Sequence, residues 1–458
     1  MKRLEPKRGR RSAFTPVHWI LFSFLLAIGL GALLLSLPVS RAPGAEPRFS
    51  DAVFTAATSV CVTGLVTVPT AFTWSVFGQI VILLLIQIGG LGVITCLAGL
   101  MIGIHRRMGL GDRLLLQDAF NLNTLSGIVG FVRRVILGTL AVEGGGALLC
   151  MPSLCRRFGA RGIWYAVFHA ISAFCNAGID LFAADSLCSF RDDALFLSAT
   201  AALIVLGGLG FPVWWDVLGL MKKNRSGRRR RACSLRLQSK LALSATAALL
   251  LGGTALFFVF EAKNPATLGS LPFGQKLLGA FFQSVTTRTA GFAALPQEAL
   301  TPPSVFVSLL LMFIGGSPVG TAGGVKTVTV FVLAATAASS VKNRQDVSVF
   351  GRSVSPDTVK KAAAVAATSF AILSLSTLAL GAATDCPLAD LLYETVSATA
   401  TVGLTRGLTP TLPEAGKWIV IVNMYLGRVG PISLAAAFSL RRESENVVKN
   451  PTEPLSVG

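Results

Sequence analysis

The sequence predicts an all-α polytopic membrane protein made of four repeats that surround a pseudo-fourfold pore axis. Three observations support this fold class. Of the 458 residues, 52% are hydrophobic and only 14% are charged, whereas soluble domains carry about 25% charged residues. A short glycine-containing phrase occurs four times, and its glycines are 114, 113 and 112 residues apart along the chain. Each phrase follows a short apolar segment that lies between two long apolar segments.

The long apolar segments predict eight transmembrane helices, two in each repeat. The first, His18 to Pro38, has 21 residues and is about 31 Å long as a helix, while a bilayer core measures about 30 Å. This run is longer than the apolar part of a signal peptide. We expect first spans near 18–38, 131–151, 237–260 and 358–381, and second spans near 76–103, 193–220, 303–337 and 417–440.

The short apolar segments predict four re-entrant pore helices. A helix of about 12 residues is ~18 Å long, too short to cross the bilayer, so it must enter the membrane and turn back. The non-helical residues that follow lie at membrane depth, where such backbone is tolerated only inside protein or along a water-filled path. We expect these helices at Ser50–Cys61, Trp164–Cys175, Gln275–Thr287 and Leu388–Ala400.

The four repeats should form a ring. Each repeat crosses the membrane twice, so all four have the same orientation, and such repeats are related by an axis along the membrane normal. Four re-entrant segments around that axis enclose a pore. The predicted boundaries are residues 1–103 for repeat one, 104–220 for repeat two, 221–337 for repeat three, 338–440 for repeat four and 441–458 for a C-terminal tail.

The glycine phrase is the candidate ion-binding site. A re-entrant helix whose C-terminus points inward places the negative end of its dipole near the membrane centre, which favours a cation. Potassium filters replace the ion's hydration shell with carbonyl oxygens, and their sequence begins T-V-G. The alternative is that the glycines only allow close helix packing. The candidate K⁺-binding residues are Val62, Thr63, Gly64, Asn176, Ala177, Gly178, Thr289, Ala290, Gly291, Thr401, Val402 and Gly403.

A second candidate site interrupts the second span of repeat three, where glycine and proline are too frequent for a stable helix. We expect this segment to line the pore below the filter as a gate; a passive kink is the alternative. The candidate gate residues are Gly315, Gly316, Ser317, Gly320, Thr321, Ala322, Gly323, Gly324 and Lys326.

Arg428 is an ionisable residue inside the last predicted span. A charge in a span is costly and usually faces a cavity or a partner. We expect Arg428 to face the pore below the filter, as part of the gate, and to form an electrostatic barrier. A buried ion pair with Glu394 or Asp216 is an alternative that is compatible with this role.

The net charge of +19 at first suggests nucleic-acid binding, but the positions of the basic residues indicate membrane topology instead. Of the 41 Lys and Arg, 28 lie in the two tails and in the loops 104–134, 221–240 and 338–361, and 10 lie in the intervening loops. Short basic loops stay in the cytoplasm. We therefore expect both termini in the cytoplasm and no nucleic-acid partner.

The cysteines and histidines show no metal-ligand spacing. Cys61 and Cys175 occupy equivalent positions in repeats one and two. We therefore expect these two thiols to pack behind the glycine phrases rather than to form a disulfide.

Taken in order, these phrases make the chain resemble the Trk/Ktr/HKT superfamily of potassium transporters, and most of all the Ktr membrane subunit. The resemblance covers nearly the whole chain. It rests on Val62-Thr63-Gly64-Leu65, Ile86-Gln87-Ile88-Gly89-Gly90-Leu91-Gly92, Asn176-Ala177-Gly178, Thr287-Arg288-Thr289-Ala290-Gly291-Phe292, Thr321-Ala322-Gly323-Gly324-Val325-Lys326-Thr327, Thr401-Val402-Gly403-Leu404 and Gly427-Arg428-Val429-Gly430-Pro431.

The resemblance implies potassium uptake across the cytoplasmic membrane through a potassium-channel-like pore in one subunit. It also implies a homodimer and regulation by a separate cytoplasmic ring of nucleotide-binding subunits. The nucleotide would then belong to the partner, and this chain would bind K⁺ with no other cofactor, the need for Na⁺ being left open. All four filter glycines are present, which implies selectivity for potassium. The chain departs from the family at Val319 and Gly320, where a smaller or polar residue and a serine are expected.

Two other function classes are weaker. A secondary transporter for another cation or a small solute is the main alternative, but such proteins often have inverted repeats. An enzyme is not indicated, because the sequence shows no Ser/His/Asp set and no phosphate loop. Gly89-Gly90-Leu91-Gly92 is no dinucleotide fingerprint, because it lies inside a predicted span with no strand before it.

Overall fold

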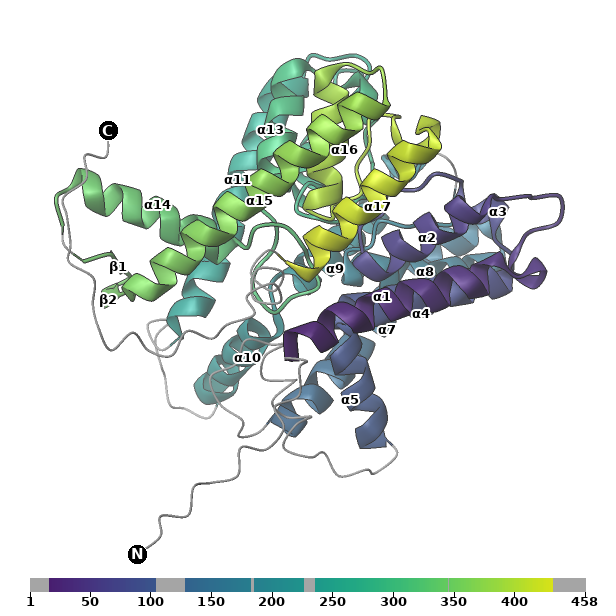
Figure 1. Ribbon diagram of the computed structural model, residues 1–458. Coiled ribbons are helices and arrows are strands. Elements are labelled where there is room, and N and C mark those ends of the chain that lie inside the picture. The colour runs from purple at the N-terminus through teal and green to yellow at the C-terminus, as the bar shows by residue number, and fades with distance from the viewer. Residues whose placement is uncertain (1–15, 104–127, 183–184, 226–234, 345, 431–458) are drawn as a thin grey trace, which may run out of the picture.

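The computed structural model describes residues 16–103, 128–182, 185–225, 235–344 and 346–430, and its regular structure is almost entirely helical (Figure 1). The described strands are β1 (Ser348–Val349) and β2 (Arg352–Ser353), which form a small antiparallel hairpin. Short 3₁₀ helices lie at Pro38–Ser40, Cys188–Phe190, Gln297–Ala299 and Thr409–Thr411.

The α-helices follow the order expected for four repeats of a long helix, a short helix and a second span. Repeat one has α1 (Pro16–Ser36), α2 (Phe49–Cys61), α3 (Thr70–Thr73), α4 (Val76–Leu91) and α5 (Val93–Gly103). Repeat two has α7 (Ile128–Phe158), α8 (Arg161–Cys175), α9 (Ala194–Gly208) and α10 (Phe211–Arg225). The rest are α11 (Leu237–Glu261), α12 (Phe273–Thr286), α13 (Pro302–Phe313), α14 (Thr327–Val341), α15 (Pro356–Ala383), α16 (Leu388–Thr399) and α17 (Glu414–Val429).

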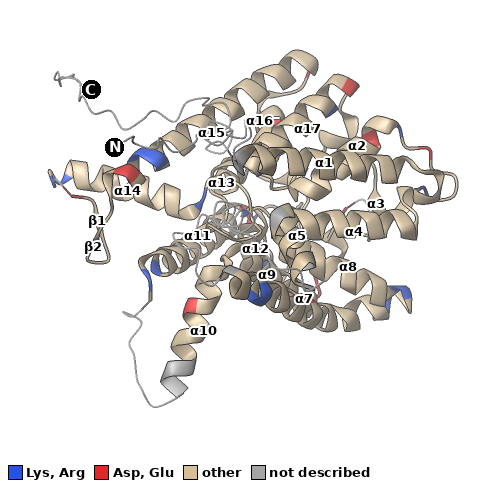
Figure 2. Cartoon of the chain, turned by 60° about the horizontal axis from the view of Figure 1, so that its bottom comes forward, with Lys and Arg blue, Asp and Glu red and all other residues tan. Residues whose placement is uncertain are grey.

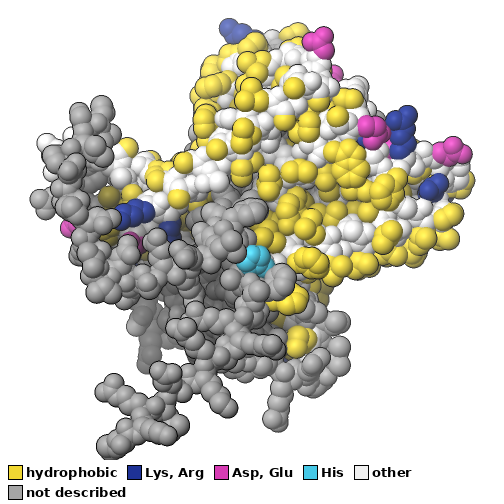
Figure 3. Space-filling view, in the orientation of Figure 1, with side chains coloured by type: hydrophobic (Ala, Val, Ile, Leu, Met, Phe, Trp, Pro, Cys, Tyr) yellow, Lys and Arg dark blue, Asp and Glu magenta, His cyan; other side chains and the backbone are white. Residues whose placement is uncertain are grey.

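The first helix of each repeat is a membrane span. Among the described residues, α1, α7, α11 and α15 are each long and apolar enough to cross a bilayer. Large apolar side chains such as Phe22 and Leu33 of α1 stand more than half exposed. Figure 3 shows a broad apolar flank with charged side chains near its edges, and Figure 2 shows how little of the helix length carries charge. This is a protein surface solvated by lipid, as the composition predicts.

The four short helices lie where the sequence predicts re-entrant pore helices. They are α2, α8, α12 and α16, and each has 12 to 15 residues. Their observed ends lie within three residues of the expected ones. Every residue of α2 after Phe49 is buried. These helices form the interior of the molecule, with the long apolar helices outside them.

The expectation of continuous second spans is wrong in repeats one and two. In repeat one, α4 ends at Leu91, Gly92 follows with a φ of 88°, and α5 begins at Val93. In repeat two, α9 and α10 meet at a bend of 101° beside Gly210, whose φ is 87°. In repeat four, α17 ends at Val429 and Gly430 follows with a φ of 86°; the expected remainder of that span lies outside the described residues. A left-handed glycine ends the helix each time because the helical hydrogen-bond ladder cannot continue through it.

The second spans hold the pore helices through direct backbone contact. Gly89, Gly207 and Gly427 occupy equivalent positions in repeats one, two and four. A Cβ at these three positions would collide with the carbonyl oxygens of Val60, Phe174 and Thr399, which lie in the last turns of the pore helices. A side chain there would therefore push the pore helix away from its span.

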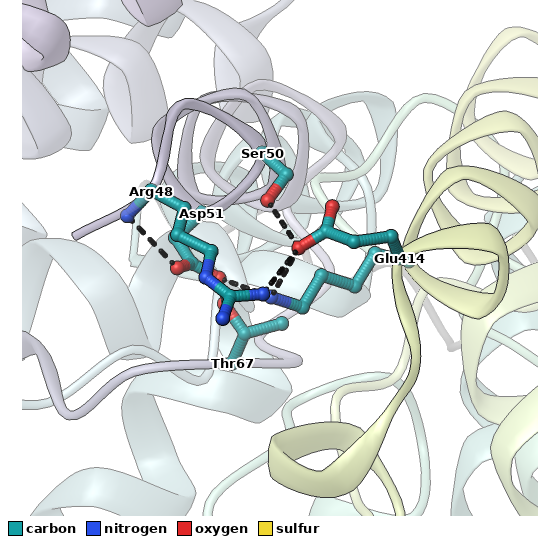
Figure 4. A network of polar contacts seen from close by, with 6 residues as sticks. Arg48, Ser50, Asp51, Thr67 and Glu414 are labelled. Carbon is teal, nitrogen blue, oxygen red and sulfur yellow. Dashed lines mark hydrogen bonds and ion pairs between the residues drawn. The ribbon is translucent and has the colours of Figure 1, made fainter.

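The ring of repeats is closed by a polar network between repeats one and four (Figure 4). Lys417 Nζ of α17 lies 2.8 Å from Asp51 Oδ1 of α2, and both side chains are at least 90% buried. Asp51 also accepts a hydrogen bond from Thr67 Oγ1 at 2.9 Å. Ser50 Oγ donates to Glu414 Oε1 at 3.1 Å, and Arg48 forms an exposed ion pair with the same carboxylate. The first and last repeats are thereby joined.

Replacing Lys417 should destabilise the protein strongly. The change Lys417→Gln leaves the Asp51 carboxylate buried without its cation, which typically costs about 3 kcal/mol or more. We expect a clear fall in the melting temperature of the detergent-solubilised protein, and partial recovery in the double variant Lys417→Gln, Asp51→Asn. The matched control is Arg48→Gln, because its exposed pair with Glu414 contributes about 1 kcal/mol or less. Equal melting temperatures for Lys417→Gln and Arg48→Gln would contradict a closing role for the buried pair.

Candidate functional site

Each glycine phrase begins with a residue in the left-handed region of φ. These residues are Val62, Asn176, Thr289 and Thr401, with φ values of 56°, 59°, 65° and 51°. A positive φ is uncommon for any residue with a side chain and is an outlier for β-branched Val and Thr. Such strain costs about 1–3 kcal/mol per residue and gathers at functional sites. The same strain at the same place in four repeats indicates a site that needs this backbone.

The four phrases meet in a closed ring. A Cβ added to Gly64 would lie 2.5 Å from the carbonyl oxygen of Ala177, one on Gly178 would lie 2.7 Å from that of Ala290, and one on Gly291 would lie 2.5 Å from that of Val402. A Cβ on Gly403 would collide with the carbonyl oxygen of Thr63, so the sequence of contacts returns to repeat one. The glycines therefore face one another and not a helix, and the helix-packing alternative is wrong.

The pore helices hold the ring through hydroxyl residues that sequence reasoning missed. The backbone N–H of Gly64 donates to Thr58 Oγ1 at 2.9 Å, and that of Gly403 donates to Ser397 Oγ at 3.0 Å. Ser172 Oγ donates to the Ile179 carbonyl, and Thr286 Oγ1 donates to the Phe292 carbonyl, both at 2.6 Å. These residues could have been found from the sequence, because a Ser or Thr precedes the glycine by six residues in repeats one, two and four.

The polar atoms of the ring are mainly carbonyl and hydroxyl oxygens. Its residues Thr63, Ala177, Ala290 and Val402 are fully buried, so their surroundings exclude bulk water. Thr63 Oγ1 and Thr401 Oγ1 are buried hydroxyl oxygens without a hydrogen-bond partner among the described residues. Buried polar groups are normally satisfied. Carbonyl and unpaired hydroxyl oxygens are ligands that suit a dehydrated alkali cation.

The glycine-rich segment of repeat three is a loop closed at its base, between α13 and α14. Gly315 N–H donates to the Val325 carbonyl at 2.9 Å, and Thr327 N–H donates to the Gly316 carbonyl at 3.0 Å. The hydroxyls of Ser317 and Thr327 are 3.2 Å apart. The helix stops before this base and resumes after it, so the segment is not a kink in a continuous helix.

This loop lies against the ring of glycine phrases and against repeat two. Gly323 N–H donates to Thr289 Oγ1 at 3.2 Å, which joins the loop to the glycine phrase of repeat three. Thr321 Oγ1 donates to the Phe174 carbonyl at the end of α8 at 3.0 Å. Ser317 N–H donates to the Gly208 carbonyl at 2.9 Å, beside the bend between α9 and α10. The loop therefore packs against the break between α9 and α10 in repeat two.

Two partly buried cations, Lys326 and Arg428, lie beside the loop. Arg428 donates from Nη1 to the Thr321 carbonyl at 2.7 Å and from Nη2 to the Gly89 carbonyl at 2.5 Å. Lys326 Nζ donates to the Ala322 carbonyl at 2.7 Å. Arg428 thus ties the loop to the second span of repeat one. In repeats one and two, the position equivalent to Arg428 is a glycine, Gly90 or Gly208.

The alternative ion pair of Arg428 is wrong. Glu394 accepts hydrogen bonds from the hydroxyls of Thr405 and Thr409. Asp216 accepts from the backbone N–H of Arg236 at 2.9 Å. Within the described part of the chain, the partners of Arg428 are carbonyl oxygens, so its positive charge is not neutralised. Cys61 and Cys175 are buried free thiols behind the filter, as the sequence predicts.

The sequence departure at Val319 and Gly320 has a structural counterpart. Val319 has a φ of 61°, the conformation that a β-branched residue resists most. Its carbonyl accepts from Phe211 N–H at 3.0 Å. A Cβ on Gly320 would lie 2.9 Å from the Gly207 carbonyl, so this position is tight for any side chain. Strain at the tip of the loop is held by contacts with repeat two.

These features define a class of protein: a helical membrane protein whose four repeats bring four re-entrant backbone segments together at one ring. Comparison with known sequences then identifies the family. A family model described as TrkH, cation transport protein, matches residues 20–450. The chain belongs to this family of cation transport proteins.

Two relatives match almost the full length of this chain. It is 38% identical to the Ktr system potassium uptake protein B of Bacillus subtilis, over 94% of each chain. It is 34% identical to the potassium/sodium uptake protein NtpJ of Enterococcus hirae, over 99% of each chain. The fold is also similar to the crystal structure of the potassium transporter TrkH from Vibrio parahaemolyticus, with a TM-score of 0.74 and 17% identity over 94% of this chain and 86% of that one.

Val319→Gly should stabilise the loop. Glycine adopts a φ of 61° freely, so the change removes strain of about 1–3 kcal/mol, offset by about 1 kcal/mol of added unfolded-chain entropy. We expect a small rise in melting temperature and slower proteolysis of the loop. The control is Val365→Gly in the interior of α15, which should lower the melting temperature because glycine weakens a helix. A fall in melting temperature for Val319→Gly would contradict the strain.

Proposed function

We propose that the chain carries potassium ions across the cell membrane through the ring of glycine phrases. One observation supports this proposal above all. Each of Gly64, Gly178, Gly291 and Gly403 packs against a carbonyl group of the next repeat, and the last contact returns to repeat one. An ion on the axis would exchange its hydration shell for carbonyl oxygens of the candidate K⁺-binding residues. The names of the two relatives, a potassium uptake protein and a potassium/sodium uptake protein, support a monovalent cation as cargo.

Selection of potassium over sodium would depend on the fixed positions of the carbonyls. The four hydroxyl braces from Thr58, Ser172, Thr286 and Ser397 limit how far the ring can contract around a smaller ion. The C-terminal ends of the four pore helices face the ring and add negative potential. Combined potassium and sodium transport is the second candidate function, and the name of the Enterococcus relative favours it.

The loop between α13 and α14 would act as the gate, with Arg428 and Lys326 as the electrostatic barrier. The hydrogen bond from Gly323 to Thr289 supports a position of the loop next to the ring. A cation that leaves the ring would meet both positive side chains. Opening would break the hydrogen bond between the loop and the Gly208 carbonyl and the hydrogen bond between Arg428 and the Thr321 carbonyl.

The surroundings of this pore are also proposals. We infer a multi-pass protein of the cell membrane with both termini in the cytoplasm, because 28 of the 41 basic residues lie in the tails and alternate loops. We propose the repeat boundaries 1–103, 104–220, 221–337 and 338–440, with a tail at 441–458. A homodimer and a cytoplasmic ring of nucleotide-binding subunits are proposed from the likeness to a Ktr system protein.

The proposal is tested with the purified chain in liposomes. Uptake of rubidium-86 should be blocked by external potassium and spared by the same concentration of sodium. Strong block by both ions would favour the second candidate function. Uptake that neither ion reduces would overturn the proposed pathway.

Gly291→Ser should weaken discrimination against sodium. The added Cβ would lie 2.5 Å from the Val402 carbonyl, so that carbonyl must move and the ring loses its spacing. We expect the ratio of the sodium to the potassium inhibition constant to fall about tenfold or more, because a displaced ligand alters binding by at least about 1.4 kcal/mol. The control is Gly144→Ser on α7, whose Cβ would meet nothing within 4 Å. An unchanged ratio for Gly291→Ser would count against the filter assignment.

Removal of the loop should raise basal flux. Deleting Gly316 to Gly323 eliminates the contacts with Thr289, Phe174 and Gly208 and frees the space below the ring. We expect faster rubidium uptake without any partner subunit, at unchanged melting temperature of the core. Unchanged uptake in well-folded protein would leave the loop as scaffold.

A further inference from the structure

A cavity of about 380 Å³ lies below the filter ring. Its walls come from the loop between α13 and α14, the end of α4, the end of α17, and the helices α1 and α15. Sites for small organic ligands typically measure about 300–1,000 Å³. The cavity is therefore large enough for more than a single ion and its water.

Two positive side chains line the cavity. They are Lys326 and Arg428, and no Asp or Glu is among the described lining residues. Both side chains use carbonyl oxygens as partners, and each has further N–H groups that can donate. The helix α14 begins at Thr327 beside the cavity, without an acidic residue in its first turn. Its N-terminal dipole adds to the positive potential.

Another part of the cavity lining is apolar and belongs to helices that face lipid. Ile20 and Phe24 of α1 and Val365 and Ile372 of α15 line it. The helices α1 and α15 both pack on α17. Their outer faces are apolar and exposed, as Phe22 at 62% and Phe370 at 64% show, and Figure 3 shows the apolar flank.

Charge and shape together suit one kind of ligand. Two cations without counter-charges in a membrane interior are costly unless an anion neutralises them. Arginine and lysine bind phosphate oxygens well, and basic pockets between membrane helices bind lipid head groups. The apolar wall provides contact for the carbon atoms next to such a head group.

We infer that this cavity binds a phosphate-bearing anion at Lys326 and Arg428, supplied by the head group of an anionic phospholipid that reaches it between α1 and α15. The second part of the inference rests on the proposed function. The bound anion neutralises the barrier below the filter and thereby assists cation flow. Free inorganic phosphate has the same chemistry and is the other source.

The binding is tested without transport. Native mass spectrometry of the detergent-purified protein counts bound phosphatidylglycerol in the wild type, Arg428→Gln and Lys326→Gln. We expect about tenfold weaker binding of one lipid in each variant, because a charge-assisted hydrogen bond contributes about 1.5–3 kcal/mol. The matched control is Lys361→Gln, an exposed cation on α15, which should bind as the wild type does. Equal lipid counts in all four proteins would overturn the site, whatever the transport assay shows.

The functional part is tested by rubidium uptake in phosphatidylcholine vesicles with increasing phosphatidylglycerol. We expect the lipid to raise uptake severalfold in the wild type and in Lys361→Gln, and not in Arg428→Gln. If phosphatidylglycerol raised uptake equally in Arg428→Gln, the effect would come from the surface charge of the vesicle. That result would overturn the proposed role of the bound anion in cation flow. If inorganic phosphate displaces the lipid and raises uptake in pure phosphatidylcholine, the anion is free phosphate. If it does neither, the head group is the ligand.

Discussion

The structure depends on the meeting of four glycines whose missing side chains point at one another's carbonyl groups. Gly64, Gly178, Gly291 and Gly403 leave just enough space for the neighbouring backbone, so any side chain would open the ring. Strained left-handed residues precede them, and a backbone of this kind persists only where its surroundings determine it fully. The short pore helices, their hydroxyl groups and the second spans that press on their last turns all serve to hold this one arrangement.

Much of this fold could be predicted from the sequence, because the repeat spacing and the short apolar segments are local patterns. The re-entrant helices lie within three residues of their predicted ends. The breaks at Gly92 and Gly210 escaped prediction, because an apolar run containing glycine is compatible with a continuous helix until tertiary contacts select the left-handed φ. The carbonyl partners of Arg428 could not be foreseen either. They belong to residues 107 and 339 positions away along the chain. Every residue has a backbone carbonyl, so the sequence does not show which of them Arg428 contacts.

The fourfold plan holds at the filter and fails just below it. The second residue of the equivalent glycine motif is Gly90 in repeat one and Gly208 in repeat two, but Arg428 in repeat four. Repeat three interrupts its second span with a loop between α13 and α14, which lies against the ring. The ring is built from four equivalent backbone segments. The region below it is built from different parts of the four repeats, among them one loop and one guanidinium.

The buried pair of Asp51 and Lys417 has a consequence for biosynthesis. The two residues are 366 positions apart, on the first pore helix and on the last described helix. A ribosome completes Asp51 long before Lys417 exists, so the first pore helix must wait with an unmatched carboxylate while three further repeats are inserted. A chain truncated before α17 would lack Lys417 and leave the Asp51 carboxylate at an open edge between repeats one and four.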